Sequence, residues 1–207
     1  MSESLGLVGK VEQLTINPLS RDEMSEVRQQ LRFSLEGLIE DRYYGIGRKI
    51  GIKEKSSFRL TKPEIQAANI PGQEEQVLNW RQWSAVSLEE MLKLAKAYGL
   101  PETKEEALHL AQIIGANITV SGIENFTDIP PASLLAFPRC RLLVVTRTLP
   151  CEAAGKKIAH HYHGIDASRF PEIALGIRGQ VGMVFKGGEI DLGAEVTVLK
   201  RGQELRW

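Results

Sequence analysis

The chain has 207 residues, of which 43% are hydrophobic and 25% are charged. This balance is ordinary for a globular protein and excludes intrinsic disorder as a description of the whole chain. The 26 basic residues are matched by 26 acidic ones, which argues against a nucleic-acid-binding protein that relies on strong electrostatic attraction. We expect a single domain over residues 1–207, with a core large enough to fold without disulfides or a metal.

The sequence also bears on the cellular compartment. Nothing at the N-terminus resembles a signal peptide, and no segment reaches the ~18 apolar residues of a membrane span. The two cysteines, Cys140 and Cys151, are too few for a disulfide scaffold. We therefore predict a soluble cytoplasmic protein with reduced thiols that binds neither nucleic acid nor a membrane.

The first part of the chain mixes strand and helix signals. Leu7–Ile16 is rich in aliphatic and β-branched residues and stops before a proline, so a strand is predicted. Apolar residues spaced by three and four over Arg21–Leu31 predict a short amphipathic helix. Val77–Val86 holds two of the three tryptophans and is predicted to be a strand.

Two later helices have clear start signals. Ser87-Leu-Glu-Glu90 and Thr103-Lys-Glu-Glu106 are capping boxes, in which a hydroxyl and a carboxylate each accept a backbone N–H that the first turn leaves unpaired. We expect the first of these helices to end at Gly99 and the second to end at Gly115.

From Ala116 onward the pattern changes to short β segments separated by glycine and proline. The predicted strands are Ile118–Val120, Leu142–Arg147, Val181–Phe185 and Val196–Leu199, with a two-residue hairpin turn in Lys186–Glu189. Many short strands with a few inserted helices predict a mainly β fold, a mixed β-barrel with peripheral helices.

Cys151 is one candidate for chemistry. It directly follows an apolar predicted strand, which places its thiol on a loop that a ligand can reach. A positive neighbour would favour the thiolate, and Lys156 and Lys157 are close in sequence. The alternative is that the residue is a small buried apolar group, which is the interpretation we prefer for Cys140.

Three of the four histidines lie in His160-His161-Tyr162-His163. In a strand only His161 and His163 would share a face, because adjacent side chains point to opposite sides. Together with Cys151 they suggest a zinc site, but the spacing matches no common structural zinc pattern. We prefer a polar, partly exposed segment, with contact between one histidine and an anionic ligand as a further possibility.

Arg42 and Arg178 are candidates for anion binding. Arg42 lies in Asp41-Arg42-Tyr43-Tyr44-Gly45, where an aspartate can orient the guanidinium and a glycine lets backbone approach a ligand. A surface salt bridge between Asp41 and Arg42 explains the same pattern. Arg178 precedes the last predicted hairpin and either faces a ligand or caps a sheet. The dinucleotide, P-loop, nucleophile-elbow and His-Glu-x-x-His signatures are absent from the sequence, which disfavours the functions they mark.

Taken in order, several of these segments resemble the MOSC domain, the module named after the C-terminal domain of molybdenum cofactor sulfurase. The segments are Gly9–Glu12, Gly37 with Asp41–Gly45, Ala116–Gly122, Thr146–Cys151, Arg178–Val181, Gly188–Gly193 and Val196–Val198. The similarity runs from about Val8 to Val198, and the order and spacing of these motifs are more specific than any one of them.

The resemblance implies a β-barrel with peripheral helices and gives Cys151 the family's cysteine position. In amidoxime-reducing members the matching cysteine ligates molybdenum held by a pterin dithiolene, so Cys151 is expected to be both a catalytic residue and the metal ligand. The other residues expected to bind the molybdenum cofactor are Asn117, Thr119 and Ser121 at the pterin and Arg42 and Arg178 at its phosphate.

Three functions stay open from the sequence. The first is binding of the molybdenum cofactor and reduction of an N-hydroxylated small molecule, with electrons from a separate redox partner because no ferredoxin-like cysteine set is present. The second is a sulfur carrier that takes a persulfide on Cys151 from a cysteine desulfurase. The third is a non-catalytic barrel that binds a small molecule or a protein. It is kept open by Tyr43, where many members have His, and by Ala194, where the final turn usually has Asp.

Overall fold

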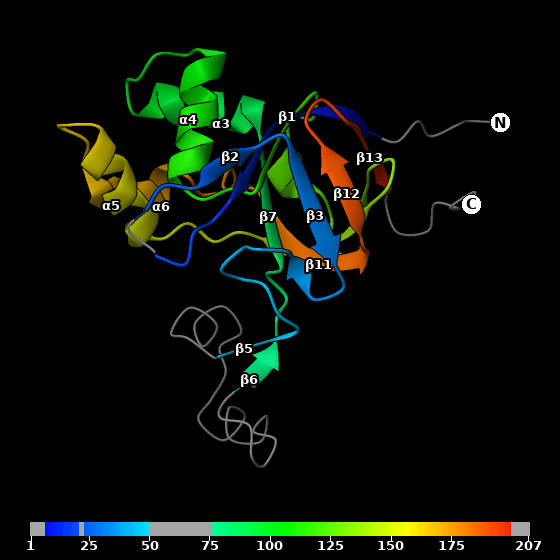
Figure 1. Cartoon of the computed structure of the whole chain (residues 1–207). Coiled ribbons are helices and arrows are strands. Elements are labelled where there is room, and N and C mark those ends of the chain that lie inside the picture. Colours follow the sequence, from blue (N-terminus) through cyan, green and yellow to red (C-terminus); the bar gives the residue numbers. More distant parts are fainter. Residues whose placement is uncertain (1–6, 21–22, 50–75, 200–207) are drawn as a thin grey trace.

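A β-barrel with helices on one side makes up the described part of this computed structural model, residues 7–20, 23–49 and 76–199 (Figure 1). The strands are β1 (Leu7–Ile16), β2 (Glu26–Arg28), β3 (Gln30–Ser34), β4 (Gly37–Leu38), β5 (Gly47–Lys49), β6 (Gln76–Leu78), β7 (Trp83–Ser87), β8 (Ile118–Ser121), β9 (Leu134–Ala136), β10 (Arg141–Arg147), β11 (Gln180–Lys186), β12 (Gly188–Asp191) and β13 (Glu195–Leu199). The helices are α3 (Leu88–Ala97), α4 (Lys104–Ile113), α5 (Glu152–His161) and α6 (Phe170–Ile173), with 3₁₀ turns η1 (Phe126–Asp128) and η2 (Ala167–Arg169).

Seven strands close the barrel in the order β13-β9-β10-β11-β7-β8-β1, and pairing of β13 with β1 completes the ring. Strands β7 and β8 run parallel because α3 and α4 form the crossover between them. The other neighbouring strands of the ring run antiparallel. The mixed β-barrel predicted from the sequence is therefore confirmed.

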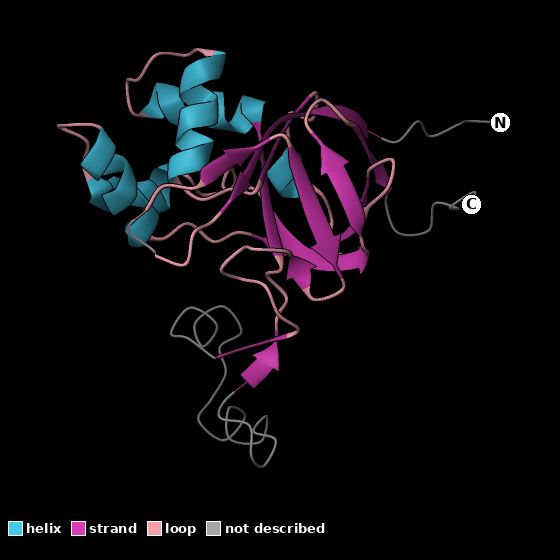
Figure 2. Cartoon of the chain, viewed as in Figure 1, coloured by secondary structure: helices cyan, strands magenta, loops and turns pink. Residues whose placement is uncertain are grey.

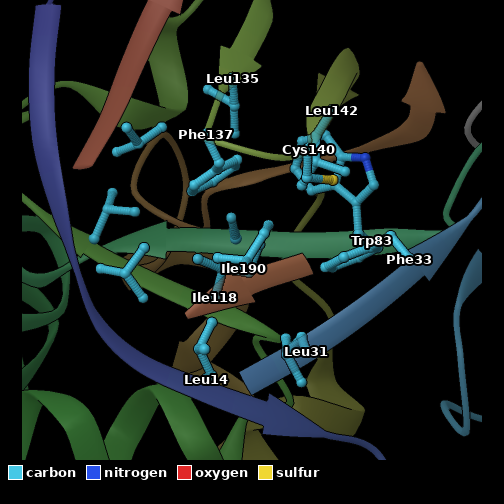
Figure 3. Close-up of a cluster of buried hydrophobic side chains, with 14 of the residues drawn as sticks. Leu14, Leu31, Phe33, Trp83, Ile118, Leu135, Phe137, Cys140, Leu142 and Ile190 are labelled. Carbon is cyan, nitrogen blue, oxygen red and sulfur yellow. The ribbon is translucent and has the colours of Figure 1, made fainter. Parts of the chain in front are cut away.

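The barrel is filled by side chains from several strands. Figure 3 shows Leu14, Trp83, Ile118 and Leu142 among the side chains of this cluster, and none of the four is more than 1% exposed. Burial of each such side chain stabilises the fold by about 1.5–3 kcal/mol. The indole N–H of Trp83 donates to the Met183 carbonyl at 2.9 Å, so burial leaves this polar atom satisfied.

A second apolar cluster is formed by side chains of α3, α4, α5 and α6 together with Val86 of β7. Figure 2 shows these helices on one side of the barrel. Both predicted helix starts are confirmed, because Ser87 Oγ accepts the Glu90 N–H at 3.2 Å and Thr103 Oγ1 accepts the Glu106 N–H at 3.3 Å. The two glutamate carboxylates bind elsewhere: Glu90 accepts from Thr127 and Glu106 accepts from the Tyr162 hydroxyl. None of the described helices is long and apolar enough to cross a membrane.

Two local predictions are wrong. The helix expected over Arg21–Leu31 is replaced by β2 and the start of β3, with residues 21–22 outside the described part. The side chain of Leu31 enters the barrel core, while Val27 is 49% exposed, so pairing with β1 outweighs the helical spacing. Lys186–Glu189 forms no hairpin either, because β11 stays in the barrel while β12 pairs with β3 in a separate sheet.

Two further predictions need refinement. The strand expected over Val77–Val86 is interrupted, with β6 pairing with β5 away from the barrel and β7 joining the ring. The helix α5, which begins directly after Cys151, was not predicted. Gly155 inside this helix has a packing role, because a Cβ there would lie 2.2 Å from the Ala167 carbonyl oxygen. A glycine lets α5 approach η2 closely.

Candidate functional site

One end of the barrel collects most of the residues that the sequence singled out. The pairings of β1 with β8 and of β10 with β11 place the C-terminal ends of β1 and β10 beside the N-terminal ends of β8 and β11. Strand β7 pairs with both β11 and β8, so the N-terminal ends of β8 and β11 lie at the same end of the barrel. The segments that enter or leave the barrel at this end carry Asn17, Asn117, Cys151 and Arg178.

Asp41 fixes the loop that carries Arg42 and Tyr43 to this end of the barrel. This residue is 4% exposed. Oδ2 accepts the backbone and side-chain N–H groups of Asn17 at 2.8 and 3.0 Å and the side-chain N–H of Asn117 at 2.7 Å, while Oδ1 accepts the Tyr43 N–H at 2.9 Å. The surface salt bridge considered from the sequence is therefore wrong. Asp41 orients Arg42 indirectly, because Arg42 Nη2 donates to Asn17 Oδ1 at 3.3 Å.

Asn117 is at the site, but its side chain is occupied within the protein. Its Nδ2 donates to Asp41 and to the Thr15 carbonyl, and its Oδ1 accepts the Ser84 backbone N–H at 3.0 Å. The Ser84 hydroxyl lies within hydrogen-bond distance of both this Oδ1 and the Gly115 carbonyl. A side-chain amide has two N–H donors, and both are used within the protein, while its oxygen already accepts a backbone N–H. Direct contact with a pterin stays a prediction, and the hydrogen bonds assign Asn117 a role in positioning Asp41.

Thr119 and Ser121 follow along β8 and lead away from this end of the barrel. Thr119 is 1% exposed. The Ser121 hydroxyl donates to Glu12 Oε1 at 2.6 Å, and Glu12 also pairs with Lys104 at the start of α4. At about 3.3 Å per residue, Ser121 is ~13 Å along the strand from Asn117. The structure therefore does not bring Ser121 together with Cys151.

Two arginines flank the ring of Tyr43. The guanidinium carbons of Arg42 and Arg81 lie 5.3 and 5.5 Å from the ring centroid. Such cation–π contacts stabilise a pair of like charges held close together. Arg81 was not predicted, because it lies inside the single strand expected over Val77–Val86. In the structure it falls between β6 and β7 and reaches Tyr43 there. We call Arg42, Arg81 and the nearby Arg178 the arginine group. Tyr43, which stands where many MOSC-like sequences have His, lies between two of its members.

Arg178 is the most deeply buried charge of this group. It is 7% exposed, and its Nη2 donates to the Ile114 carbonyl at the end of α4 at 2.8 Å. Burial is the main cause that lowers the pKa of Arg178 to about 10, and the positive charge of Arg81 adds to it. Cys151 and Tyr43 act in the opposite direction, stabilising the guanidinium. Arg178, Arg81, Tyr43 and Cys151 therefore lie within electrostatic range of one another.

Two guanidinium N–H positions at this site have no acceptor among the residues that the structure describes. They are Arg42 Nε and Arg178 Nη1, both buried from solvent. Buried donors in folded proteins are almost always paired, with protein, water or ligand, so two orphaned guanidinium donors indicate a place for an acceptor. A phosphate offers several charged acceptor oxygens and matches the geometry of arginine.

Cys151 is the N-cap residue of α5, which refines the loop position expected from the sequence. It is partly buried, and the positive end of the α5 dipole together with Arg178 favours the thiolate. Cys140 has the opposite environment. It is fully buried in the barrel core, and burial raises its pKa to about 12, so only Cys151 is suited to ligation or nucleophilic chemistry.

The histidine segment does not join the site. His160 and His161 are in the last turn of α5, at the opposite end of this helix from Cys151, and both are exposed. The condition under which His161 and His163 would share a strand face is therefore not met. Over residues 7–20, 23–49 and 76–199, no group of three or more His, Cys, Asp and Glu side chains is placed to hold a metal ion, so the zinc site has no support.

The residues present fit a ligand with two chemical parts. A thiolate is a soft donor that suits a thiophilic metal, while the orphaned guanidinium donors suit a phosphate. The molybdenum cofactor, which the resemblance implied, combines a metal with a phosphate-bearing pterin. The donor set at this end of the barrel is therefore compatible with it.

Comparisons with known proteins agree with this fold. The model of the MOSC domain matches residues 72–197. A Bacillus subtilis protein described as "Putative metal-sulfur cluster biosynthesis proteins YuaD" is 31% identical over 172 residues, covering 82% of this chain and 79% of that protein. The crystal structure of YuaD from Bacillus subtilis superposes with a TM-score of 0.77 at 29% identity, over 92% of this chain and 95% of that chain.

A more distant structure shares the fold alone. YiiM from Escherichia coli superposes with a TM-score of 0.52 at 13% identity, over 95% of this chain and 72% of that one. The family model covers more than half of the chain, and YuaD matches most of it. This chain is therefore a member of the MOSC domain family.

Proposed function

We propose that this protein binds the molybdenum cofactor at the barrel end formed by Cys151 and the arginine group of Arg42, Arg81 and Arg178. The observation that carries the proposal is a pair of buried guanidinium donors, Arg42 Nε and Arg178 Nη1. Neither has an acceptor within residues 7–20, 23–49 and 76–199. They lie in a group that interacts with the thiol at the start of α5. The site thus combines anion donors with a soft ligand.

Each residue has a distinct role in this proposal. Cys151 supplies the thiolate that ligates the metal, and the positive charge of Arg178 and the N-terminal end of α5 attract its negative charge. Arg42 and Arg178 donate to the phosphate of the pterin through their orphaned N–H groups. Arg81 adds positive charge, and Tyr43 holds Arg42 and Arg81 in place through its ring.

The proposed reaction is reduction of an N-hydroxylated small molecule. When bound, the cofactor would supply a metal centre that exchanges electrons with the substrate, while the protein orients both. Electrons would come from a separate redox partner, because the sequence contains no ferredoxin-like set of four cysteines. We place the protein in the cytoplasm, where a reducing environment keeps Cys151 as a thiol.

The arginine part of this proposal is tested by pterin retention. Arg178→Met is compared with Arg139→Met, which removes an exposed arginine paired with Glu189 and Asp191. Each protein is purified from a host that makes the cofactor, and released pterin is measured by fluorescence after oxidation. We expect Arg178→Met to lose the pterin and Arg139→Met to keep it. Equal pterin in both variants would refute the assignment of Arg178 to the phosphate.

A sulfur carrier is the second candidate, and the partial exposure of Cys151 at a helix N-terminus favours it. The relative YuaD is described as a putative metal-sulfur cluster biosynthesis protein. The Cys151 thiolate would attack the outer sulfur of a cysteine desulfurase persulfide. The donor S–S bond breaks, its thiolate leaves and takes a proton, and a persulfide forms on Cys151 without an external oxidant.

Mass spectrometry tests this second function. Incubation with a cysteine desulfurase and cysteine should add the mass of one sulfur to Cys151, and Cys151→Ser should gain none. Because Cys140 is buried in the barrel core, it serves as an internal reference thiol that stays unmodified. The sulfur-carrier function is ruled out if Cys151 stays unmodified while a control carrier is loaded.

A further inference from the structure

Glu90 is a buried carboxylate that the proposed chemistry does not use. It is 1% exposed and lies in the first turn of α3. A capping-box glutamate would turn back to Ser87, but this one faces η1. Oε1 accepts the Thr127 backbone N–H at 2.7 Å, and Oε2 accepts the Thr127 hydroxyl at 2.9 Å. Both carboxylate oxygens therefore hold one residue.

Thr127 passes this contact on to the segment that carries Arg178. Its Oγ1 accepts the Gly179 N–H at 2.7 Å. A hydroxyl has a single hydrogen, and here the carboxylate takes it, so the oxygen lone pairs are left for Gly179. The negative charge of Glu90 thus sets the direction in which Thr127 binds the Gly179 peptide.

Gly179 links Arg178 to the segment that leads to Cys151. Gly179 directly follows Arg178, and its carbonyl accepts the Thr148 N–H at 2.8 Å, three residues before Cys151. Gly179 has little room to move, since a Cβ there would lie 2.0 Å from the Ala85 carbonyl oxygen. A movement of Gly179 would therefore change the positions of both Arg178 and the segment that carries Cys151.

The η1 segment is itself held firmly. The side-chain amide of Gln180 donates to the carbonyls of Phe126, Thr127 and Ile129 at 3.2, 2.6 and 3.0 Å. Thr127 is therefore anchored from the barrel side by Gln180 and from the helix side by Glu90. The chain of contacts from Glu90 to Gly179 is continuous and runs through buried groups.

We propose that Glu90 is a positioning residue for Cys151 and Arg178, acting through Thr127 and the Gly179 peptide. The inference deepens the proposed function, on which it rests for the role of Cys151 and Arg178. Glu90 touches neither residue in this chain of contacts. Its carboxylate orients the Thr127 hydroxyl, which in turn fixes the peptide between the arginine and the strand that leads to the cysteine.

The protonation state of Glu90 can be used to test this chain of contacts. Burial raises its pKa to about 7, although the two hydrogen bonds from Thr127 lower it. Lys93 on α3 lowers this pKa as well, and Asp128 on η1 raises it. As the pH falls through 7, the carboxyl group gains a proton and one oxygen stops accepting well. The hold on Thr127 and Gly179 should then weaken.

The experiment measures alkylation of Cys151 by iodoacetamide as a function of pH, followed by mass spectrometry. Cys140 does not interfere, because it is buried and its pKa is raised to about 12. In the unaltered protein we expect two steps in the rate, one from the thiol itself and one near pH 7 from Glu90. The step near pH 7 should vanish in Glu90→Gln, which keeps the size of the side chain but cannot ionise.

A matched pair of variants separates positioning from folding. Thr127→Val removes the hydroxyl and should also lose the step near pH 7, whereas Thr127→Ser keeps the hydroxyl and should retain it. If Glu90→Gln does not fold, this pair still decides. The inference is overturned if folded Thr127→Val keeps the profile of the unaltered protein or if Thr127→Ser loses it. Absence of molybdenum from the unaltered protein would count against the proposed function but leave this result standing.

Discussion

The side-chain amide of Asn117 donates to the buried carboxylate of Asp41 at 2.7 Å and joins segments 76 residues apart. One segment enters β8, and the other carries Arg42 and Tyr43. Because the same carboxylate oxygen also accepts two bonds from Asn17 at the end of β1, three parts of the chain meet on one atom. The Asp41 carboxylate therefore holds the segments that carry the arginine group in place, although it binds Asn17 and Asn117 in these contacts and not an arginine.

Replacement of Asp41 tests this organisation. In Asp41→Asn an amide N–H would face N–H donors that now converge on a carboxylate, so buried donors lose their acceptor. We expect the free energy of unfolding in urea to fall by about 3 kcal/mol. Asp191→Asn removes a carboxylate whose side chain is 52% exposed and should change stability by less than about 1 kcal/mol. Equal effects of the two changes would contradict the role of Asp41.

Two glycines with the same backbone angle give a sharp comparison. Gly179 has φ +79° and Gly176 has φ +81°, but a Cβ at Gly179 would lie 2.0 Å from the Ala85 oxygen, while at Gly176 it meets nothing within 4 Å. Gly176→Ala should therefore cost only the backbone strain of about 1 kcal/mol. Gly179→Ala adds a clash with strand β7 and should cost about 3 kcal/mol or more. Thermal unfolding of both variants measures the difference, and similar losses would contradict this packing.

Arg178 is expected to lower the free energy of unfolding of the protein, although it contributes to binding of the pterin phosphate. Replacing a buried charge that lacks full pairing by an apolar side chain is often stabilising, so Arg178→Met should be more stable than the unaltered protein by about 1 kcal/mol. Loss of pterin in this variant would then not result from unfolding. A clear loss of stability in urea would show that the hydrogen bond to Ile114 outweighs the cost of burial.

The difference in stability between the unaltered protein and Arg178→Met should depend on pH. The pKa of Arg178 is about 10, below its ordinary value of 12.5, so the folded state gives up this proton more readily than the unfolded state. The cost of burying the charge is therefore constant below pH 10 and shrinks as the pH rises above it. The stability advantage of Arg178→Met should narrow above pH 10 in urea titrations. An advantage that grows there would contradict the assignment.

The barrel could be predicted because its signals are local. Short β-rich runs became β8, β10, β11 and β13, and the hydroxyl caps at Ser87 and Thr103 start α3 and α4 as expected. The start of α5 carries no such signal, because Cys151 is not a preferred capping residue and Gly155 lowers helix propensity. That glycine is required by packing against η2, which the sequence alone does not show.

The site was predictable only in part. Cys151, Arg42 and Arg178 were singled out from the sequence as candidates, and the structure brings them to one end of the barrel. Their roles at a cofactor stay predictions. Arg81 was missed, because its contact with Tyr43 depends on how the chain returns to β7. The network from Asp41 to Asn17 and Asn117 was missed for the same reason, since its members are far apart in sequence and meet only after the barrel closes.

The central claim is that Cys151 ligates the metal of a bound cofactor, and the molybdenum-to-protein ratio tests it most directly. Protein is purified from a molybdate-fed host that makes the cofactor, beside Cys151→Ser and the core control Cys140→Ser. The account predicts near-stoichiometric molybdenum in the unaltered protein and in Cys140→Ser, and its loss in folded Cys151→Ser. Undiminished molybdenum in Cys151→Ser would contradict it.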